Sequence, residues 1–190
     1  MYFLFIESIF ISPLYCIVIN KIENDEVFEL KLFKWTGPLE ETGNLPEEAR
    51  ASLMNNDEEV LVLQEAETTT LDHAVEYDIL DQSGDLPSGR FAVLNNIPVT
   101  EEGRETFEQR FNNRARLIEA EPGFVAIRVL RPVHSDTYVI LTMWEDEQSF
   151  KNWQESQAYG KAHAKRGTKE GVDQRPNIFS GPSFVTTYKK

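Results

Sequence analysis

The chain of 190 residues contains one cysteine, Cys16, and three histidines, His73, His134 and His163. A single cysteine excludes an internal disulfide and a cluster of thiolate ligands, so we predict a cytoplasmic protein. A three-histidine metal site would need all three, although they lie in separate segments. The chain also lacks a glycine-rich phosphate loop, a G-x-S-x-G motif and an H-E-x-x-H motif. No common catalytic motif therefore assigns a function.

Positive charge is scarce in the first half of the chain. Residues 1–90 hold 19 Asp and Glu but 5 Lys and Arg, whereas residues 91–190 hold 13 and 14, respectively. A nucleic-acid-binding protein needs a basic face, and neither half offers one, so we expect no nucleic-acid partner. The balanced second half leaves room for a local basic pocket that meets an anionic ligand.

The first twenty residues are apolar but lack the flanking charges of a targeting segment. No Lys or Arg precedes Lys21, which disfavours a secretory signal. A membrane span would have to bury Glu7 and tolerate Pro13, and it is the less favoured alternative. We predict that residues 1–20 are an apolar extension, weakly structured or an edge strand, and expect no membrane partner.

The segment 21–88 is predicted to be rich in strands. Alternating apolar residues indicate strands over 27–35 and 59–65. The stretch 71–82 has a potential cap at Asp72 and apolar Val75, Ile79 and Leu80, which favours a short amphipathic helix. Two glycines and a proline within 83–89 indicate a boundary, which divides the chain into 21–88 and 89–190.

The segment 89–190 has a clearer pattern. We predict strands over 90–99, 124–132, 137–144 and 183–188, with helices over 100–121 and 145–156. The order is β-α-β-β-α-β, which indicates an α+β fold of the ferredoxin-like, split βαβ type. Its four-stranded sheet has one uncovered face, and such domains pair face to face into a barrel. The strand-rich first half is the candidate partner, and a ligand would bind between sheet and helices.

Two adjacent asparagines interrupt the apolar strand over 90–99. Asparagine is disfavoured within a strand, so one of the pair is expected to face a polar or liganded space. Alternation places Asn95 on the bulkier face and Asn96 on the other. Asn95 is therefore the better candidate for an amide that donates to a ligand.

Trp153 and His163 lie ten residues apart in one predicted helical stretch. An unbroken helix would separate them by about 15 Å, too far for contact but suited to flanking one planar ligand. Gly160 allows a bend between them. Taken singly, Trp153 is typical of a core residue and His163 of a surface residue. Three basic residues stand near His163: Lys161, Lys165 and Arg166.

With these residues in place, the chain resembles the heme-degrading monooxygenases of the IsdG type, HmoB-like branch, within the antibiotic-biosynthesis-monooxygenase (ABM) fold family. The likeness is carried by "GRFAVLNNIPVTEEGRETFEQRFNNRA", "EPGFVAIRVLRP", "SDTYVILTMWEDEQSFKNWQESQAYGKAHAKRGT" and "PSFVTTY". It implies that Asn95 is the distal amide, Trp153 presses on the porphyrin and His163 is the proximal iron ligand. The basic residues near His163 would meet the propionates: Lys161, Lys165 and Arg166.

The resemblance also implies a function and an assembly. Heme would be substrate and cofactor at once, and dioxygen and electrons from an external reductase or small reductant would open the ring and release iron. The two halves would form a dimeric-type α+β barrel, making a monomer that mimics the family's usual dimer. The alternatives are a non-enzymatic TRAP-like signalling or stress protein, a heme-buffering protein, and a cofactor-free monooxygenase acting on a quinol-like aromatic.

Overall fold

The computed structural model describes residues 29–190 except 51, 113, 163, 165–166 and 169–175. The expected extension over residues 1–20 lies outside the described residues, as do three of the expected site residues: His163, Lys165 and Arg166. Within the described part, no helix is both long enough and apolar enough to cross a membrane.

Eight antiparallel strands form a closed barrel in the order β1-β3-β2-β8-β5-β7-β6-β4. Both halves of the chain contribute strands to this one sheet, and its closure leaves no free sheet edge among the described strands. The strands are β1 Lys31–Pro38, β2 Met54–Asn55, β3 Glu59–Ala66, β4 Val75–Gly84, β5 Phe91–Pro98, β6 Phe124–Pro132, β7 Thr137–Trp144 and β8 Phe184–Lys189. This architecture confirms the predicted α+β class and the ferredoxin-like barrel.

The strand order repeats between the two halves. In the second half the order β8-β5-β7-β6 is that of a split βαβ sheet, and in the first half β4-β1-β3-β2 has the same order. The halves join where β4 pairs with β6 and where β2 pairs with β8. The predicted boundary at 88–89 falls at the end of η2 Leu86–Ser88, which connects the two halves.

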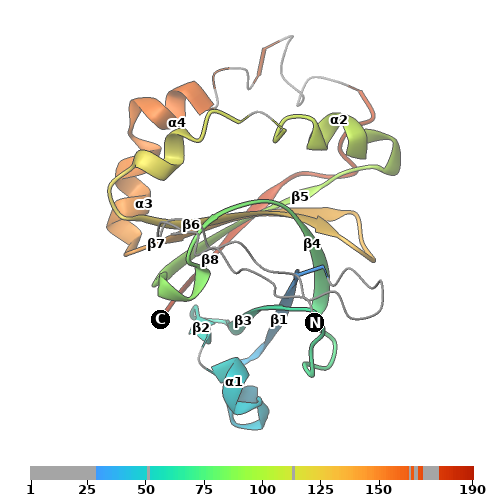
Figure 1. Ribbon diagram of the computed structural model, residues 1–190, viewed down its shortest axis with the longest axis vertical. Coiled ribbons are helices and arrows are strands. Elements are labelled where there is room, and N and C mark those ends of the chain that lie inside the picture. Colours follow the sequence, from blue (N-terminus) through green and yellow to red (C-terminus); the bar gives the residue numbers. More distant parts are fainter. Residues whose placement is uncertain (1–28, 51, 113, 163, 165–166, 169–175) are drawn as a thin grey trace, which may run out of the picture.

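The helical segments are short and lie outside the barrel. Besides η2, they are η1 Leu39–Asn44, α1 Glu47–Arg50, η3 Glu101–Gly103, α2 Arg104–Glu108, η4 Leu117–Ala120, α3 Glu147–Gln154 and α4 Gln157–Ala162. Segments α2, η4, α3 and α4 lie over the sheet formed by β5, β6 and β7, whereas α1 lies beyond β1 and β3 on the far side (Figure 1). A site between sheet and helices is thus confined to one face of the second half.

Apolar side chains from both halves fill the barrel. Its interior cluster includes Leu32 and Leu61 from the first half, with Leu94 and Leu141 from the second, all at most 1% exposed. Each strand contributes alternate residues, because successive side chains point to opposite faces. The outward residues of β5 and β7 then carry the helices.

The helix predicted over 71–82 is wrong, because the chain forms strand β4 there. Tyr77 belongs to the barrel core and Ile79 packs against it, while Asp78 forms ion pairs outside with Lys31 and Arg131. This alternation is the two-residue period of a strand. Pairing with both β1 and β6 overrides the weak helical pattern.

The helix predicted over 100–121 forms only in part. Its α-helical portion is α2 Arg104–Glu108, and η4 Leu117–Ala120 is a 3₁₀ turn. Phe107 and Phe111 pack in one cluster, whereas Ile118, which an unbroken helix would place on the same side, packs in a different cluster. The segment therefore crosses the sheet instead of lying along it.

Candidate active site

Two apolar clusters occupy the helix-covered face of the sheet. The Trp144 cluster consists of Phe91, Val93 and Trp144, with Ile118, Phe124, Phe150 and Trp153 packed against them. The Phe107 cluster consists of Val99, Phe107 and Tyr138, with Leu80, Ile97, Phe111 and Phe179. Strand β5 runs through both clusters, since it contributes Val93 to the first and Ile97 to the second.

Asn95 lies between these clusters. It is the residue between Val93 and Ile97 on the same face of β5, and it is half-buried. Its cross-strand neighbours are Ile140 on β7 and Val185 on β8, and Val185 is 57% exposed. The structure thus places one amide on an otherwise apolar stretch of sheet.

Asn96 points to the opposite side, into the end of the barrel. It is 3% exposed, and its Nδ2 donates to the Leu94 carbonyl at 3.1 Å and to Thr186 Oγ1 at 3.3 Å. These contacts give Asn96 a structural role. Of the two asparagines, only Asn95 shares a face with Trp153.

A cross-strand row continues from Asn95 over the sheet. Asn95 pairs with Ile140 on β7, Ile140 with Val129 on β6, and Val129 with Asp81 on β4. Directly paired side chains share a face, so the row forms a floor beneath the helical segments. Its far end, Asp81, comes from the first half of the chain.

Trp153 lies on α3 and packs in the Trp144 cluster. Its ring centroid lies 5.5 Å from that of Trp144, and the Tyr159 ring meets it edge to face at 4.9 Å and 83°. Such tilted and T-shaped pairs are favourable geometries for aromatic rings. The indole is therefore held from both sides, by the sheet and by α4.

Helix α3, which carries Trp153, begins after the capping residue Asp146 and ends at Gln154. Asp146 caps α3 by accepting the Ser149 N–H at 2.7 Å, and this bond lowers the pKa of the Asp146 carboxyl. Gly160 was predicted to allow a bend after Trp153, and the helical stretch is interrupted before it, at Glu155 and Ser156. Ser156 Oγ accepts the Tyr159 N–H at 3.2 Å and so begins α4.

Of the expected basic residues, Lys161 is the one within the described part. It lies near the end of α4 with its side chain exposed. The structure therefore brings Asn95 and Trp153 to one face, with Lys161 on the helix that packs against Trp153.

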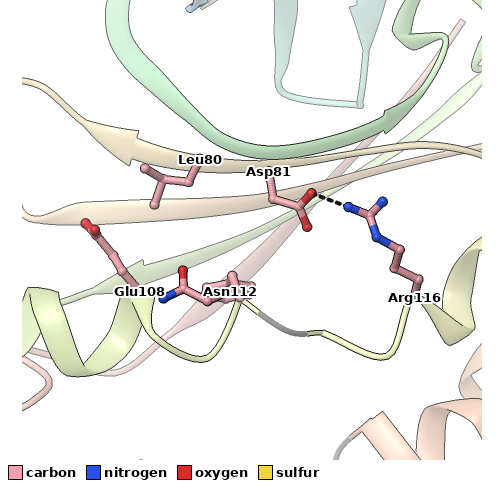
Figure 2. Close-up of a pocket in the computed structure, with 6 residues that line it drawn as sticks. Leu80, Asp81, Glu108, Asn112 and Arg116 are labelled. Atoms are coloured by element: carbon pink, nitrogen blue, oxygen red, sulfur yellow. Dashed lines mark hydrogen bonds and ion pairs between the residues drawn. The ribbon is translucent and has the colours of Figure 1, made fainter. Parts of the chain in front are cut away.

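A hollow of about 410 Å³ opens between β4 and the segment that follows α2. Its lining residues are Leu80, Asp81, Glu108, Phe111, Asn112 and Arg116. Figure 2 shows Asp81 on the strand and Arg116 on the facing segment, and the two side chains form an ion pair of 3.1 Å. The hollow thus lies at the Asp81 end of the floor.

A second polar network forms the wall near α2. The buried Tyr138 hydroxyl donates to Glu108 Oε1, and Arg131 Nη1 lies 3.4 Å from Glu108 Oε2. Burial, followed by the contact with Glu108, raises the pKa of Tyr138. Tyr138 therefore remains a neutral donor that fixes the Glu108 carboxylate.

Sequence reasoning missed the residues around this hollow. Asp81 was part of a predicted helix, and Arg114 and Arg116 part of another, so nothing suggested that they would meet. The one available signal was the alternation of residues 75–79, which is typical of a strand.

Comparisons with known proteins agree with this architecture. The family model described as "Antibiotic biosynthesis monooxygenase" matches residues 90–165. A heme oxygenase (mycobilin-producing) of Mycobacterium tuberculosis is 36% identical over 72 residues, which cover 37% of this chain and 68% of the relative.

Two solved structures share the fold over most of the chain. One, described as a major regulator of staphylococcal pathogenesis, superposes with a TM-score of 0.68 at 19% identity, covering 84% of this chain and 98% of the other. The other is a heme-degrading enzyme from Listeria monocytogenes, with a TM-score of 0.58 at 21% identity and coverages of 84% and 98%. These likenesses show the fold alone. The family model and the 36% identity to a relative that is covered over 68% of its length show that the chain belongs to the antibiotic biosynthesis monooxygenase family.

Proposed function

We propose that this protein is a heme-degrading monooxygenase whose site lies on the helix-covered face of β5. The observation that carries the proposal is the position of Asn95, a single half-buried amide on an apolar floor between two aromatic clusters. The similarity to a heme oxygenase at 36% identity supports the same chemistry.

The floor suits a porphyrin, which is a flat and largely apolar ring. Val185 and Ile140 flank Asn95 on the sheet, and Val185 remains 57% exposed. Exposed apolar surface with one convergent polar group is typical of a small-molecule site. Trp153 on α3 supplies an aromatic wall.

Each residue has a distinct role in this proposal. His163, outside the described residues, would be the iron ligand through a neutral imidazole nitrogen. Asn95 would donate an amide N–H to the bound group, because a neutral donor stabilises negative charge without giving up a proton. Trp153 would press against the ring, and Lys161, Lys165 and Arg166 would meet its propionates. Heme, when bound, supplies the iron that activates dioxygen and also the carbon skeleton that is oxidised.

One heme per chain is expected, because the equivalent face of the first half is filled. There Leu45, which follows η1, and Ala49 on α1 pack onto Val62, with the Trp35 ring beside them. All three of these aliphatic residues are at most 7% exposed. The described part of the first half thus completes the barrel and leaves no second site on this face, as in a monomer that mimics a dimer. Electrons would come from an external reductase or small reductant, and the single cysteine favours the cytoplasm.

The decisive experiment is a hemin titration of the purified chain, followed by absorbance at the Soret band. We expect the wild type to saturate near one hemin per chain. In His163→Ala the Soret band should shift and the affinity for hemin should fall, whereas His134→Ala should behave like the wild type. His134 is an exposed histidine in the turn between β6 and β7, so it controls for adventitious binding. Absence of saturable binding by the wild type would overturn the proposal.

A second measurement separates degradation from storage and signalling. With dioxygen and ascorbate, the Soret band of the complex should decay while a ferrous chelator reports released iron. Saturable binding without decay would indicate a heme-buffering protein. No binding at all would favour a TRAP-like signalling role, for which the likeness to the staphylococcal regulator supplies the fold alone.

A further inference from the structure

The segment that follows α2 forms the roof of the hollow. We define the roof segment as residues 109–112 and 114–118. It runs from the Phe107 cluster, where Phe111 packs, to the Trp144 cluster, where Ile118 packs. The roof segment therefore passes over the face that carries Asn95, and its height above the sheet sets the space available to a ligand.

Four alternating charges tie the roof segment to strand β4. Arg114 Nε contacts Asp81 and Arg114 Nη2 lies 2.6 Å from Glu119, while Arg116 lies 3.1 Å from each of the same two carboxylates. Asp81 and Arg114 side chains are each 13% exposed, so water screens this pair only partly. We call these four residues the charge ring: Asp81, Arg114, Arg116 and Glu119.

The backbone is irregular at two members of the charge ring, Asp81 and Arg116. Strand β4 has a bulge between Ile79 and Asp81, and Leu80 and Asp81 both line the hollow. Bulges re-aim side chains, often beside functional sites. Arg116 adopts φ 50° and ψ 24°, a left-handed conformation that is unfavourable for a residue with a Cβ. Such conformations persist where surrounding contacts enforce them.

Asp81 is the member on which the ring depends. It is the carboxylate that comes from the first half, and it contacts both arginines of the charge ring, Arg114 and Arg116. It also ends the cross-strand row that starts at Asn95. Removing its charge would release both arginines from the sheet at once.

We propose that Asp81 is a positioning residue for the heme site, which it serves by holding the roof segment over the floor that carries Asn95. This inference rests on the proposed function. It assigns the first half a direct part in the site, beyond its contribution to the barrel, since the second half alone lacks the carboxylate that anchors its own roof.

The test uses the full chain and compares Asp81→Asn with Glu76→Gln. Glu76 lies on the same strand and pairs with Lys31, away from the roof segment, so its variant loses an ion pair without touching the ring. Hydrogen–deuterium exchange of the apoprotein should show uptake over residues 109–121 that is on the order of tenfold faster in Asp81→Asn. Uptake in β5 and β7 should not change, and Glu76→Gln should match the wild type.

Heme release supplies the functional half of the test. Transfer of heme to an excess of a high-affinity acceptor should be on the order of tenfold faster from Asp81→Asn than from Glu76→Gln. Unchanged uptake over 109–121, or unchanged heme release despite faster uptake, would overturn the inference. If Asp81→Asn does not fold, Arg116→Gln gives the same comparison, because it removes one exposed partner of Asp81. Failure of the wild type to bind hemin would instead overturn the proposed function, and the uptake data would still decide whether Asp81 fixes the roof segment.

Discussion

Asn95 and Asp81 stand in one cross-strand row of the barrel, separated by Ile140 and Val129 on the two strands between them. At the usual spacing between strands, three steps place the two backbones about 14 Å apart. One residue belongs to the second half of the chain and the other to the first. A flat ligand on this row would therefore meet groups from both halves, although the expected site residues all follow residue 90.

The two adjacent asparagines should separate stability from function. Asn96→Ala removes buried hydrogen bonds to Leu94 and Thr186, so we expect it to lower the free energy of unfolding by about 1–2 kcal/mol. Asn95→Ala should change it by less than about 0.5 kcal/mol, yet abolish most of the heme turnover. Urea denaturation and Soret decay measure the two effects. Full turnover in Asn95→Ala would show that Asn95 is not the distal amide.

A buried ion pair connects the two halves inside the barrel. Arg128 on β6 is 4% exposed and binds both carboxylate oxygens of Glu65 on β3, as well as the Ser83 carbonyl. Glu65→Ala should lower the free energy of unfolding by about 3 kcal/mol, because the guanidinium loses its counter-charge in a shielded place.

The exposed Glu67→Ala is the matched control for that variant and should be almost neutral. The double variant Glu65→Leu with Arg128→Met should recover most of the loss, since apolar replacement of a buried pair is often tolerated. Equal urea midpoints for Glu65→Ala and Glu67→Ala would contradict this account.

The left-handed conformation of Arg116 can be tested by two substitutions at the same position. Arg116→Gly and Arg116→Ala lose the same contacts with Asp81 and Glu119. Glycine adopts φ 50° without strain, whereas the Cβ of alanine makes this conformation unfavourable, so the alanine variant should be less stable than the glycine variant by about 1 kcal/mol. Thermal unfolding measures the difference. A more stable alanine variant would mean that residue 116 does not need this conformation.

Acid should weaken the start of the helix that carries Trp153. The Ser149 N–H and hydroxyl, which donate to Asp146, hold the pKa of its carboxyl below the ordinary value. A group with a lowered folded pKa stabilises the fold fully above its unfolded pKa, and that contribution is lost as the pH falls through the folded value.

Asp146→Asn retains an acceptor oxygen but carries no charge, so it provides the comparison. We expect the wild type to be the more stable protein at neutral pH, and the difference to shrink as the pH falls below about 4. Urea denaturation at a series of pH values gives the profile. A difference that stays constant down to pH 2 would show that the Asp146 charge does not stabilise α3.

The sequence by itself determined the strands of the second half and helix α3, because their periodic patterns coincide with the structure. Alternation predicts β5, β6, β7 and β8, and an acidic start followed by Phe150 and Trp153 predicts α3. Period-two counting also distinguishes Asn95 from Asn96, since the face of a residue on a strand depends only on its parity. These features arise from local geometry, which short stretches of sequence encode.

Tertiary structure alone decided what joins the two halves. Residues 75–84 become a strand because β1 and β6 offer partners on both sides, which outweighs a weak helical pattern. The predicted helix over 100–121 gives way to the roof segment because Asp81, far away in the sequence, pairs with Arg114 and Arg116. Ion pairs between residues more than thirty positions apart leave no periodic pattern in the sequence. Only the closed barrel brings the four residues of the charge ring together.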